Sequence, residues 1–160
     1  MKARIDIAKA MPKALQALYP MTKHVNASGL DHRLLELVKM RTSQLNGCAY
    51  CLDMHAKDAR AAGETEQRLY LLDAWREAPF YSERERAALE WTEAVTLVAQ
   101  DHVPDEVFSW VREHFSEGEL LDLTIAIIAT NGWNRLNVAF RPEVGSYQPG
   151  MLDRLKVTAA

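Results

Sequence analysis

The sequence has few cysteines and lacks long apolar runs. Its longest apolar stretch, around residues 123–130, is far shorter than the roughly 20 residues that a membrane-spanning helix needs. The opening MKARIDIAKAMPKAL has neither the uninterrupted apolar stretch nor the small-residue cleavage site of a secretory signal. We therefore expect a cytoplasmic protein with no membrane partner. In that reducing compartment the two cysteines, Cys48 and Cys51, indicate redox or metal chemistry rather than a structural staple.

The chain also lacks an excess of basic charge. Its formal net charge is −3 and its acidic and basic residues are interspersed, so no basic stripe could bind phosphates and we expect no nucleic-acid partner. With 48% apolar and 26% charged residues, the composition is that of a soluble globular protein. At this length we expect one domain over residues 1–160, with a core at about 15–140.

Helical periodicity recurs along the chain, whereas no run of alternating apolar and polar residues bounded by turns is found. The sequence therefore predicts an all-α fold, a compact domain of several helices. The expected helices cover residues 12–20, 31–47, 48–63, 65–75, 82–103, 104–111 and 116–140. Pro20 is expected to end or kink the first of them. Two later helices begin with capping boxes, Ser82 with Glu85 and Ser116 with Glu119.

The last predicted helix contains LLDLTIAIIATNGWNRLNVAF and is apolar on most of its circumference. Such a helix is central in its domain or shared with a second subunit. We expect both, with burial in the domain and oligomerisation through apolar helices. The following RPEVGSYQPG is rich in turn-forming residues, so residues 141–160 are predicted to form an extended tail.

Cys48, Cys51 and His55 form the motif with the clearest chemical meaning. On a helix each residue advances about 100°, so the three lie within roughly 60° of one another on one face. An imidazole one turn beyond a thiol can take its proton or stabilise the thiolate, the form that attacks peroxides and disulfides. Gly47 places the helix start at Cys48, where the backbone can adjust to bring the sulfurs within bonding distance. The positive end of the helix dipole favours the Cys48 thiolate there.

The residues alone leave other interpretations open. A zinc site built from Cys48, Cys51, His55 and Glu36 would need two helices to converge. Structural zinc sites rarely use a carboxylate, which makes zinc the weaker interpretation. A thioredoxin fold would need a βαβ pattern that this sequence lacks. The cysteine pair could also switch an interface in a non-enzymatic, redox-sensing helical module. Glu36 itself could be an ordinary solvated helix residue.

The segment ELVKMRTSQLNGCAYCLDMHAKDARAAGE, residues 36–64, resembles the alkylhydroperoxidase D-like (AhpD-like) branch of the carboxymuconolactone decarboxylase family. That branch is marked by a glutamate, a CxxC that begins twelve residues later and a histidine four residues after the second cysteine. The matching residues are Glu36, Cys48, Cys51 and His55. The similarity extends over most of the chain, including LLDAWREAPFYSERERAALEWTEAVT and the late NGWNRLNVAF.

The resemblance implies an all-helical homo-oligomer, often a trimer or hexamer, with a peroxidase activity that needs no cofactor, haem or metal. It implies that Cys51 attacks the hydroperoxide, that Cys48 resolves the product, and that Glu36 and His55 relay protons. A dithiol or protein donor would supply the electrons. Some members carry a histidine just before the second cysteine, where this chain has Tyr50. The decarboxylase branch generally lacks the cysteine pair, so lactone chemistry is disfavoured.

Overall fold

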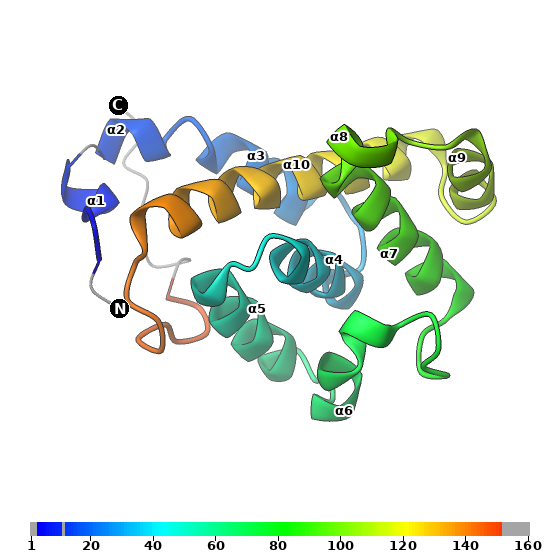
Figure 1. Ribbon diagram of the computed structural model, residues 1–160, viewed down its shortest axis with the longest axis horizontal. Coiled ribbons are helices and arrows are strands. Elements are labelled where there is room, and N and C mark those ends of the chain that lie inside the picture. The colour runs from blue at the N-terminus through cyan, green and yellow to red at the C-terminus, as the bar shows by residue number, and fades with distance from the viewer. Residues whose placement is uncertain (1–2, 11, 152–160) are drawn as a thin grey trace.

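A computed structural model describes residues 3–10 and 12–151 of the chain (Figure 1). Every regular element among these residues is helical, which confirms the predicted all-α fold. The elements are α1 (Ile7–Ala10), α2 (Pro12–Leu15), α3 (Tyr19–Ala27), α4 (His32–Leu45), α5 (Ala49–Ala61), α6 (Glu66–Tyr70), the 3-10 helix η1 (Leu72–Ala74), α7 (Glu83–Thr96), α8 (Val98–Asp101), α9 (Asp105–Arg112) and α10 (Glu117–Phe140). No helix in this described part combines the length and the hydropathy needed to cross a bilayer.

Helix α4 lies at the centre of the molecule. It packs against α5, α7 and α10, and Figure 1 shows the long α10 passing across it with α3 alongside. A short turn joins α4 to α5, and its Gly47 has a φ of +62°, a backbone conformation that glycine adopts without strain. The end of α4 and the start of α5 therefore lie together, which places Cys48 beside the central helix.

Polar side chains define where the longer helices begin. The Asp31 carboxylate accepts hydrogen bonds from the backbone N–H groups of Arg33 and Leu34, at 2.8 and 3.0 Å. Both predicted capping boxes form: Ser82 and Ser116 each accept from the backbone N–H three residues on, and the glutamate at that position accepts from the serine N–H. Caps of this kind stabilise a helix by about 1 kcal/mol each.

The helix predicted over residues 12–20 is instead a single turn, α2. It ends at Leu15, well before Pro20, which was expected to end or kink it. A new helix, α3, begins at Tyr19 and has Pro20 in its first turn. Proline fits this position because the N–H groups of a first turn have no partner within the helix. Helix α3 was not predicted from the sequence, and its Val25 is part of the core.

Two other predicted helices are interrupted. The helix expected over residues 82–103 ends as α7 at Thr96, and the short α8 follows after Leu97. The helix expected over residues 65–75 ends as α6 at Tyr70 and continues as the 3-10 helix η1. Trp75, at the end of η1, is buried, and its indole N–H donates to Glu93 Oε1 on α7 at 2.8 Å. Tertiary contacts therefore decide the shape of this segment.

The buried apolar side chains form two groups. The first gathers where α3, α4, α7, α9 and α10 meet. It contains Val25, Leu30, Leu34, Leu35, Val38, Ala87, Ala88, Trp91, Val111, Phe115, Leu120, Leu123, Ala126 and Ile127. The second lies between α4, α5 and the segment from α6 to α7. It contains Leu37, Met40, Ala59, Leu69, Leu72, Trp75, Ala78, Tyr81 and Leu89. One side of the apolar α10 packs into the core, as predicted. Leu121, Ile128 and Val138 of the same helix are exposed.

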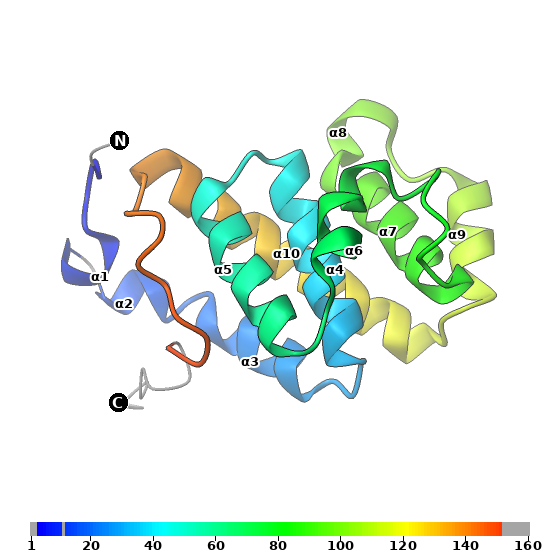
Figure 2. The ribbon, with the colours of Figure 1, turned by 90° about the horizontal axis from the view of Figure 1, so that it is seen from below.

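Beyond α10 the chain turns back along α5, as the orange segment in Figures 1 and 2 shows. Arg141 takes a left-handed conformation, with a φ of +56°, and ends α10. Residues 142–151 form no regular helix or strand; residues 152–160 of the predicted tail lie outside the described residues. Lys57 Nζ on α5 donates to the backbone oxygens of Gly145 and Tyr147, at 3.2 and 3.0 Å, and holds the segment in place.

Candidate functional site

The two cysteines lie at the start of α5 and form a disulfide bond. Cys48 is the N-cap residue: its backbone N–H donates to the carbonyl of Ser43 at 3.0 Å, and its Sγ accepts from the Cys51 N–H at 3.4 Å. The two Cα atoms are 5.3 Å apart. The prediction that Cys48 occupies a helix start, where the backbone can bring the sulfurs together, is confirmed. Both cysteines are buried, each with 1% of its surface exposed.

Glu36 and His55 meet across the interface between α4 and α5. Glu36 Oε2 lies 2.9 Å from His55 Nδ1, and Lys39 Nζ donates to Glu36 Oε1 at 2.9 Å. Glu36 is 3% exposed, so the alternative that it is a solvated helix residue is wrong. Burial alone would raise the pKa of this carboxyl, but the hydrogen bonds and charges of His55 and Lys39 outweigh it and lower the pKa to about 2. Glu36 is therefore ionised at neutral pH and can hold the His55 ring in one orientation.

Asp58 is a second carboxylate beside this pair. The ligand atoms of Glu36, His55 and Asp58 all lie within 4.8 Å of one another. Burial raises the pKa of Asp58, and the charge of Glu36 raises it further, although the Tyr147 hydroxyl, 2.9 Å from both carboxylate oxygens, lowers it. Asp58 thus lies between the Glu36–His55 pair and the segment that follows α10. This three-residue group could hold a metal ion and contains no cysteine; in the disulfide state neither sulfur can serve as a thiolate ligand.

Asparagines on α10 reach the same region from the other side. Asn131, Asn134 and Asn137 are three residues apart, so they share one face of the helix. Asn46, in the turn before Cys48, donates to the amide oxygens of Asn131 and Asn134, at 3.0 Å each. Asn137 Nδ2 donates to Cys51 Sγ at 3.3 Å. These asparagines were not predicted as site residues, although their regular spacing within NGWNRLN on a largely apolar helix is a signal in the sequence.

A hollow of about 290 Å³ lies beside the turn that precedes the cysteines. Its lining residues are Asn46, Asn134, Arg135, Val138 and Ala139. Asn46 is two residues before Cys48, and the other four form one face of α10, with Asn134 and Arg135 one turn before Val138 and Ala139. The hollow therefore lies between α10 and the α4–α5 turn, and neither cysteine is among its lining residues.

Comparison with known proteins identifies the chain. The sequence profile of the carboxymuconolactone decarboxylase family matches residues 11–94, which include Glu36, Cys48, Cys51 and His55. The chain belongs to the carboxymuconolactone decarboxylase family. It is 45% identical over 139 residues to the uncharacterized protein YdfG of Bacillus subtilis (strain 168), an alignment that covers 87% of this chain and 95% of YdfG.

Solved structures place this carboxymuconolactone decarboxylase relative among AhpD-like folds. The structure of ATU0492 of Agrobacterium tumefaciens is 46% identical in sequence to this chain, with a TM-score of 0.88, and the match covers 91% of this chain and 100% of ATU0492. ATU0492 is named as a protein of unknown function and, provisionally, as an antioxidant defence protein AhpD. The debrominase Bmp8, in its apo form, shares the fold at 23% identity, with a TM-score of 0.75 over 84% of this chain and 73% of its own. The resemblance stated from the sequence is therefore confirmed for family and fold.

Tyr50 lies between the two cysteines and is half-buried. Burial raises the pKa of its phenol, and the charge of Asp53 and the neighbouring Tyr19 raise it further. The Tyr50 hydroxyl therefore keeps its proton at neutral pH. It therefore cannot exchange protons near neutral pH in the way that a histidine at this position would.

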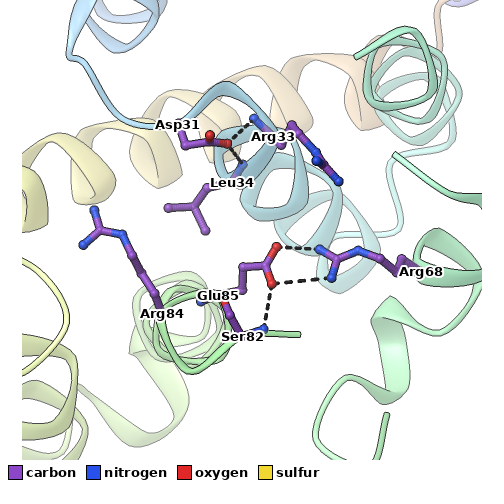
Figure 3. A pocket seen from close by; sticks show the side chains of 7 residues that line it. All are labelled: Asp31, Arg33, Leu34, Arg68, Ser82, Arg84 and Glu85. Carbon is purple, nitrogen blue, oxygen red and sulfur yellow. Dashed lines mark hydrogen bonds and ion pairs between the residues drawn. The ribbon is translucent and has the colours of Figure 1, made fainter. Parts of the chain in front are cut away.

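A hollow of about 380 Å³ lies at the opposite end of α4 from the cysteines (Figure 3). It is lined by Asp31, Arg33, Leu34, Arg68, Ser82, Arg84 and Glu85. Asp31 caps the first turn of α4, whereas Cys48 follows its last turn, and a 14-residue helix is about 20 Å long. Despite its size, this hollow is too far from the disulfide to bring a molecule into contact with the sulfurs.

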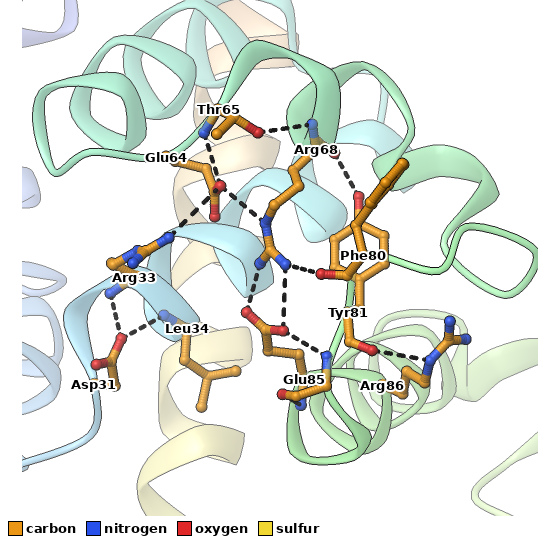
Figure 4. Close-up of polar contacts among 11 residues, drawn as sticks. Asp31, Arg33, Leu34, Glu64, Thr65, Arg68, Phe80, Tyr81, Glu85 and Arg86 are labelled. Atoms are coloured by element: carbon orange, nitrogen blue, oxygen red, sulfur yellow. Dashed lines mark hydrogen bonds and ion pairs between the residues drawn. The ribbon is translucent and has the colours of Figure 1, made fainter.

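Arg68 and Glu85, two of the charged residues that line the larger hollow, are paired with each other, and Arg68 also pairs with Glu64 (Figure 4). Arg68 Nε donates to Glu64 Oε1 at 2.9 Å, and its Nη2 donates to Glu85 Oε1 at 2.5 Å. Glu64 is 2% exposed and also accepts from the Thr65 N–H, at 2.8 Å. These contacts tie the end of α5 to the start of α7. We therefore interpret this cluster as part of the protein framework.

Proposed function

We propose that the protein is a thiol-dependent peroxidase that reduces organic hydroperoxides through the Cys48–Cys51 pair. The observation that supports this most directly is the buried contact between Glu36 on α4 and His55 on α5, with Cys51 one turn before His55 on α5. Ionised Glu36 fixes Nδ1 of the ring, which leaves Nε2 to take a proton from a thiol and return it to a leaving group. Membership of an AhpD-like fold agrees with this chemistry.

In the proposed reaction the Cys51 thiolate attacks one oxygen of the hydroperoxide and the O–O bond breaks. The leaving alkoxide takes a proton from His55 and departs as an alcohol, while Cys51 becomes a sulfenic acid. The Cys48 sulfur then loses its proton and attacks the Cys51 sulfur, forming the disulfide and releasing the hydroxyl group as water. A cytoplasmic dithiol or dithiol protein returns two electrons and two protons. Each cycle consumes one hydroperoxide and two thiols.

The small hollow beside the α4–α5 turn is the proposed route for the hydroperoxide. Because both cysteines are buried, a substrate must approach through a gap in the side chains around them. Val138 and Ala139 offer an apolar wall for an alkyl group, and the amides of Asn46 and Asn134 offer polar contacts. We expect organic hydroperoxides with small apolar groups to react through this hollow.

A single-turnover assay tests the function. Reduced protein, freed of excess dithiol, is mixed with cumene hydroperoxide; loss of one hydroperoxide and two titratable thiols per chain is expected. Cys48→Ser should still react once and leave a sulfenic acid that dimedone traps at Cys51, whereas Cys51→Ser should be inert. Reaction of Cys51→Ser at the parent rate would reverse the thiol assignment. An inert parent protein would overturn the peroxidase proposal.

A redox-sensing oligomer is the second candidate function. The observation that favours it is the exposure of Leu121, Ile128 and Val138 on α10, the helix that also contacts the Cys51 sulfur through Asn137. We propose that this face joins copies of the chain, as a trimer or hexamer, and that the state of the disulfide alters the association. Sedimentation velocity of the oxidised and the reduced protein tests this. Equal sizes and equal stabilities in the two states would exclude the sensing function.

A further inference from the structure

We propose that Asn137 is a further catalytic residue, the hydrogen-bond donor that stabilises the Cys51 thiolate. The inference deepens the proposed function and rests on its dithiol chemistry. Its basis is a contact with the reacting atom: Asn137 Nδ2 lies 3.3 Å from Cys51 Sγ, within hydrogen-bond distance for sulfur. Asn137 is 86 positions from Cys51, and no part of the sequence motif includes it.

The two cysteines have different donors. Cys48 Sγ accepts from the Cys51 N–H at 3.4 Å, which is the contact that a helix N-cap makes. Breaking the disulfide leaves this donor in place for Cys48, whereas Cys51 has the side-chain amide of Asn137. A donor that lies against a buried sulfur stabilises its charged form more strongly than a solvated donor does, because little water competes for the charge. Both cysteines are 1% exposed, so this condition holds.

The asparagine face of α10 keeps this donor in position. Asn134 is fully buried: its Nδ2 donates to Ser43 Oγ at 3.2 Å, and its oxygen accepts from Asn46 at 3.0 Å. Ser43 in turn accepts, through its backbone oxygen, from the Cys48 N–H. Hydrogen bonds of Asn134 therefore join α10 to the turn before Cys48. Asn134 is three residues before Asn137, which contacts the sulfur. Asn134 is a positioning residue in this arrangement.

The polarity of the contact also has a chemical consequence. An amide N–H donates to the sulfur but has no proton to lose at neutral pH, so Asn137 can stabilise the thiolate without competing with His55 for its proton. The two tasks are then divided between two helices. His55 on α5, held by Glu36 on α4, moves protons, and Asn137 on α10 holds the negative charge that proton removal leaves behind.

Alkylation of the reduced protein tests the inference without any peroxide. Iodoacetamide reacts with thiolates, and peptide mapping reports the rate at each cysteine separately. In the parent at pH 7, Cys51 should react faster than Cys48. In Asn137→Ala the alkylation rate of Cys51 should fall about ten-fold, because loss of a hydrogen bond to a charged group raises the pKa of that group by about one unit. The alkylation rate of Cys48 should stay within about two-fold of the parent's. Asn26→Ala, which removes the same amide from an exposed position on α3, should leave both rates unchanged.

Asn137→Asp keeps the test open if the alanine variant fails to fold. Its carboxylate has the same size as the amide but repels a thiolate, so the Cys51 rate should fall further than in Asn137→Ala. Parent-like Cys51 rates in the folded variants would overturn the inference. The alkylation result stands apart from the peroxidase assay: a parent that consumes no hydroperoxide but shows the Asn137 effect contradicts the proposed function and leaves the donor role intact.

Discussion

Glu36 Oε2 and His55 Nδ1 are 2.9 Å apart, although the two residues are 19 positions apart in the chain and belong to different helices. The contact lies in the buried interface between α4 and α5, and His55 follows Cys51 by one turn of α5. A buried carboxylate is stable only with partners that offset its lost hydration, and His55 and Lys39 provide them. The same contact that can orient the imidazole therefore also contributes to folding.

The low pKa of Glu36 predicts how stability depends on pH. Because the pKa is about 2 in the folded state and 4.5 for a glutamate free in water, the unfolded chain binds more protons between these values. The stabilisation by ionised Glu36 is complete above about pH 4.5 and is lost as the pH falls toward 2. In urea titrations, about 2 kcal/mol of the parent's loss of stability between pH 5 and pH 3 should be absent in Glu36→Gln.

A surface variant provides the comparison for this experiment. Glu77→Gln removes a carboxylate from an exposed position and should keep the parent's dependence on pH. Glu36→Gln should also lower stability at pH 7, because Lys39 and His55 lose their charged partner in a buried place. A Glu36→Gln curve parallel to that of the parent between pH 5 and pH 3 would contradict the low pKa.

The Arg68 cluster predicts a large structural effect far from the disulfide. In Arg68→Ala the carboxylate of Glu64, 2% exposed, loses its main cation, and a buried charge without a partner costs about 3–5 kcal/mol. Thermal unfolding should show a clear fall in Tm. The control is Arg76→Ala, since the Arg76 side chain is 50% exposed and its ion pairs with Glu90 and Glu93 are worth about 1 kcal/mol or less. Equal losses in the two variants would contradict the framework role of Arg68.

Local sequence signals predicted the helices that carry the chemistry. Ser82 and Ser116 begin helices because each can cap the backbone within three residues, and Gly47 marks the turn that makes Cys48 an N-cap. The helix face shared by Cys48, Cys51 and His55 follows from the same short-range geometry. Glu36 needed the family spacing as well, because helix periodicity alone does not show which helix lies against α5.

Contacts between distant segments were outside the reach of such signals. Asn137 meets Cys51 across 86 positions, and Tyr147 meets Asp58 across 89. Pairing of this kind depends on how α10 crosses α4 and on where the chain turns after Arg141, which local propensity does not encode. Pro20 shows that a clear local signal can also be ambiguous. Proline is compatible with either a helix end or a first turn, and packing of α3 against α10 selects the first turn.

The two sides of α10 predict a contrast between matched leucines. Leu123 is fully buried in the first core group, so Leu123→Ala should leave a cavity and lower the free energy of unfolding by about 3 kcal/mol. Leu121 lies two positions earlier on the same helix and is 67% exposed. In the monomer, Leu121→Ala should change stability by less than about 0.5 kcal/mol. Urea unfolding at low protein concentration measures both. A large effect of Leu121→Ala that grows with protein concentration would mean that this side is covered by a second copy.

The Tyr147 hydroxyl predicts a pH-dependent link between residues 142–151, the C-terminal segment that the structure describes, and the Glu36–His55 pair. Tyr147 donates to Asp58 at 2.9 Å and lowers a carboxyl pKa that burial raises, so Tyr147→Phe should raise the Asp58 pKa further. The hydroxyl favours the ionised carboxylate. Its loss should therefore cost about 1–2 kcal/mol at pH 7 and progressively less as the pH falls and Asp58 takes up a proton in both proteins.

Tyr70→Phe is the matched control for this prediction. Tyr70 is 75% exposed, and its hydroxyl donates to Glu66 at 3.2 Å on the surface of α6, so its loss should change stability by less than about 0.5 kcal/mol at either pH. Urea titrations of the three proteins at pH 7 and pH 4 measure the difference. A Tyr147→Phe loss that is the same at both pH values would mean that the ring contributes through packing alone. Asp58 would then be independent of the C-terminal segment, and that segment would have no electrostatic connection to the Glu36–His55 pair.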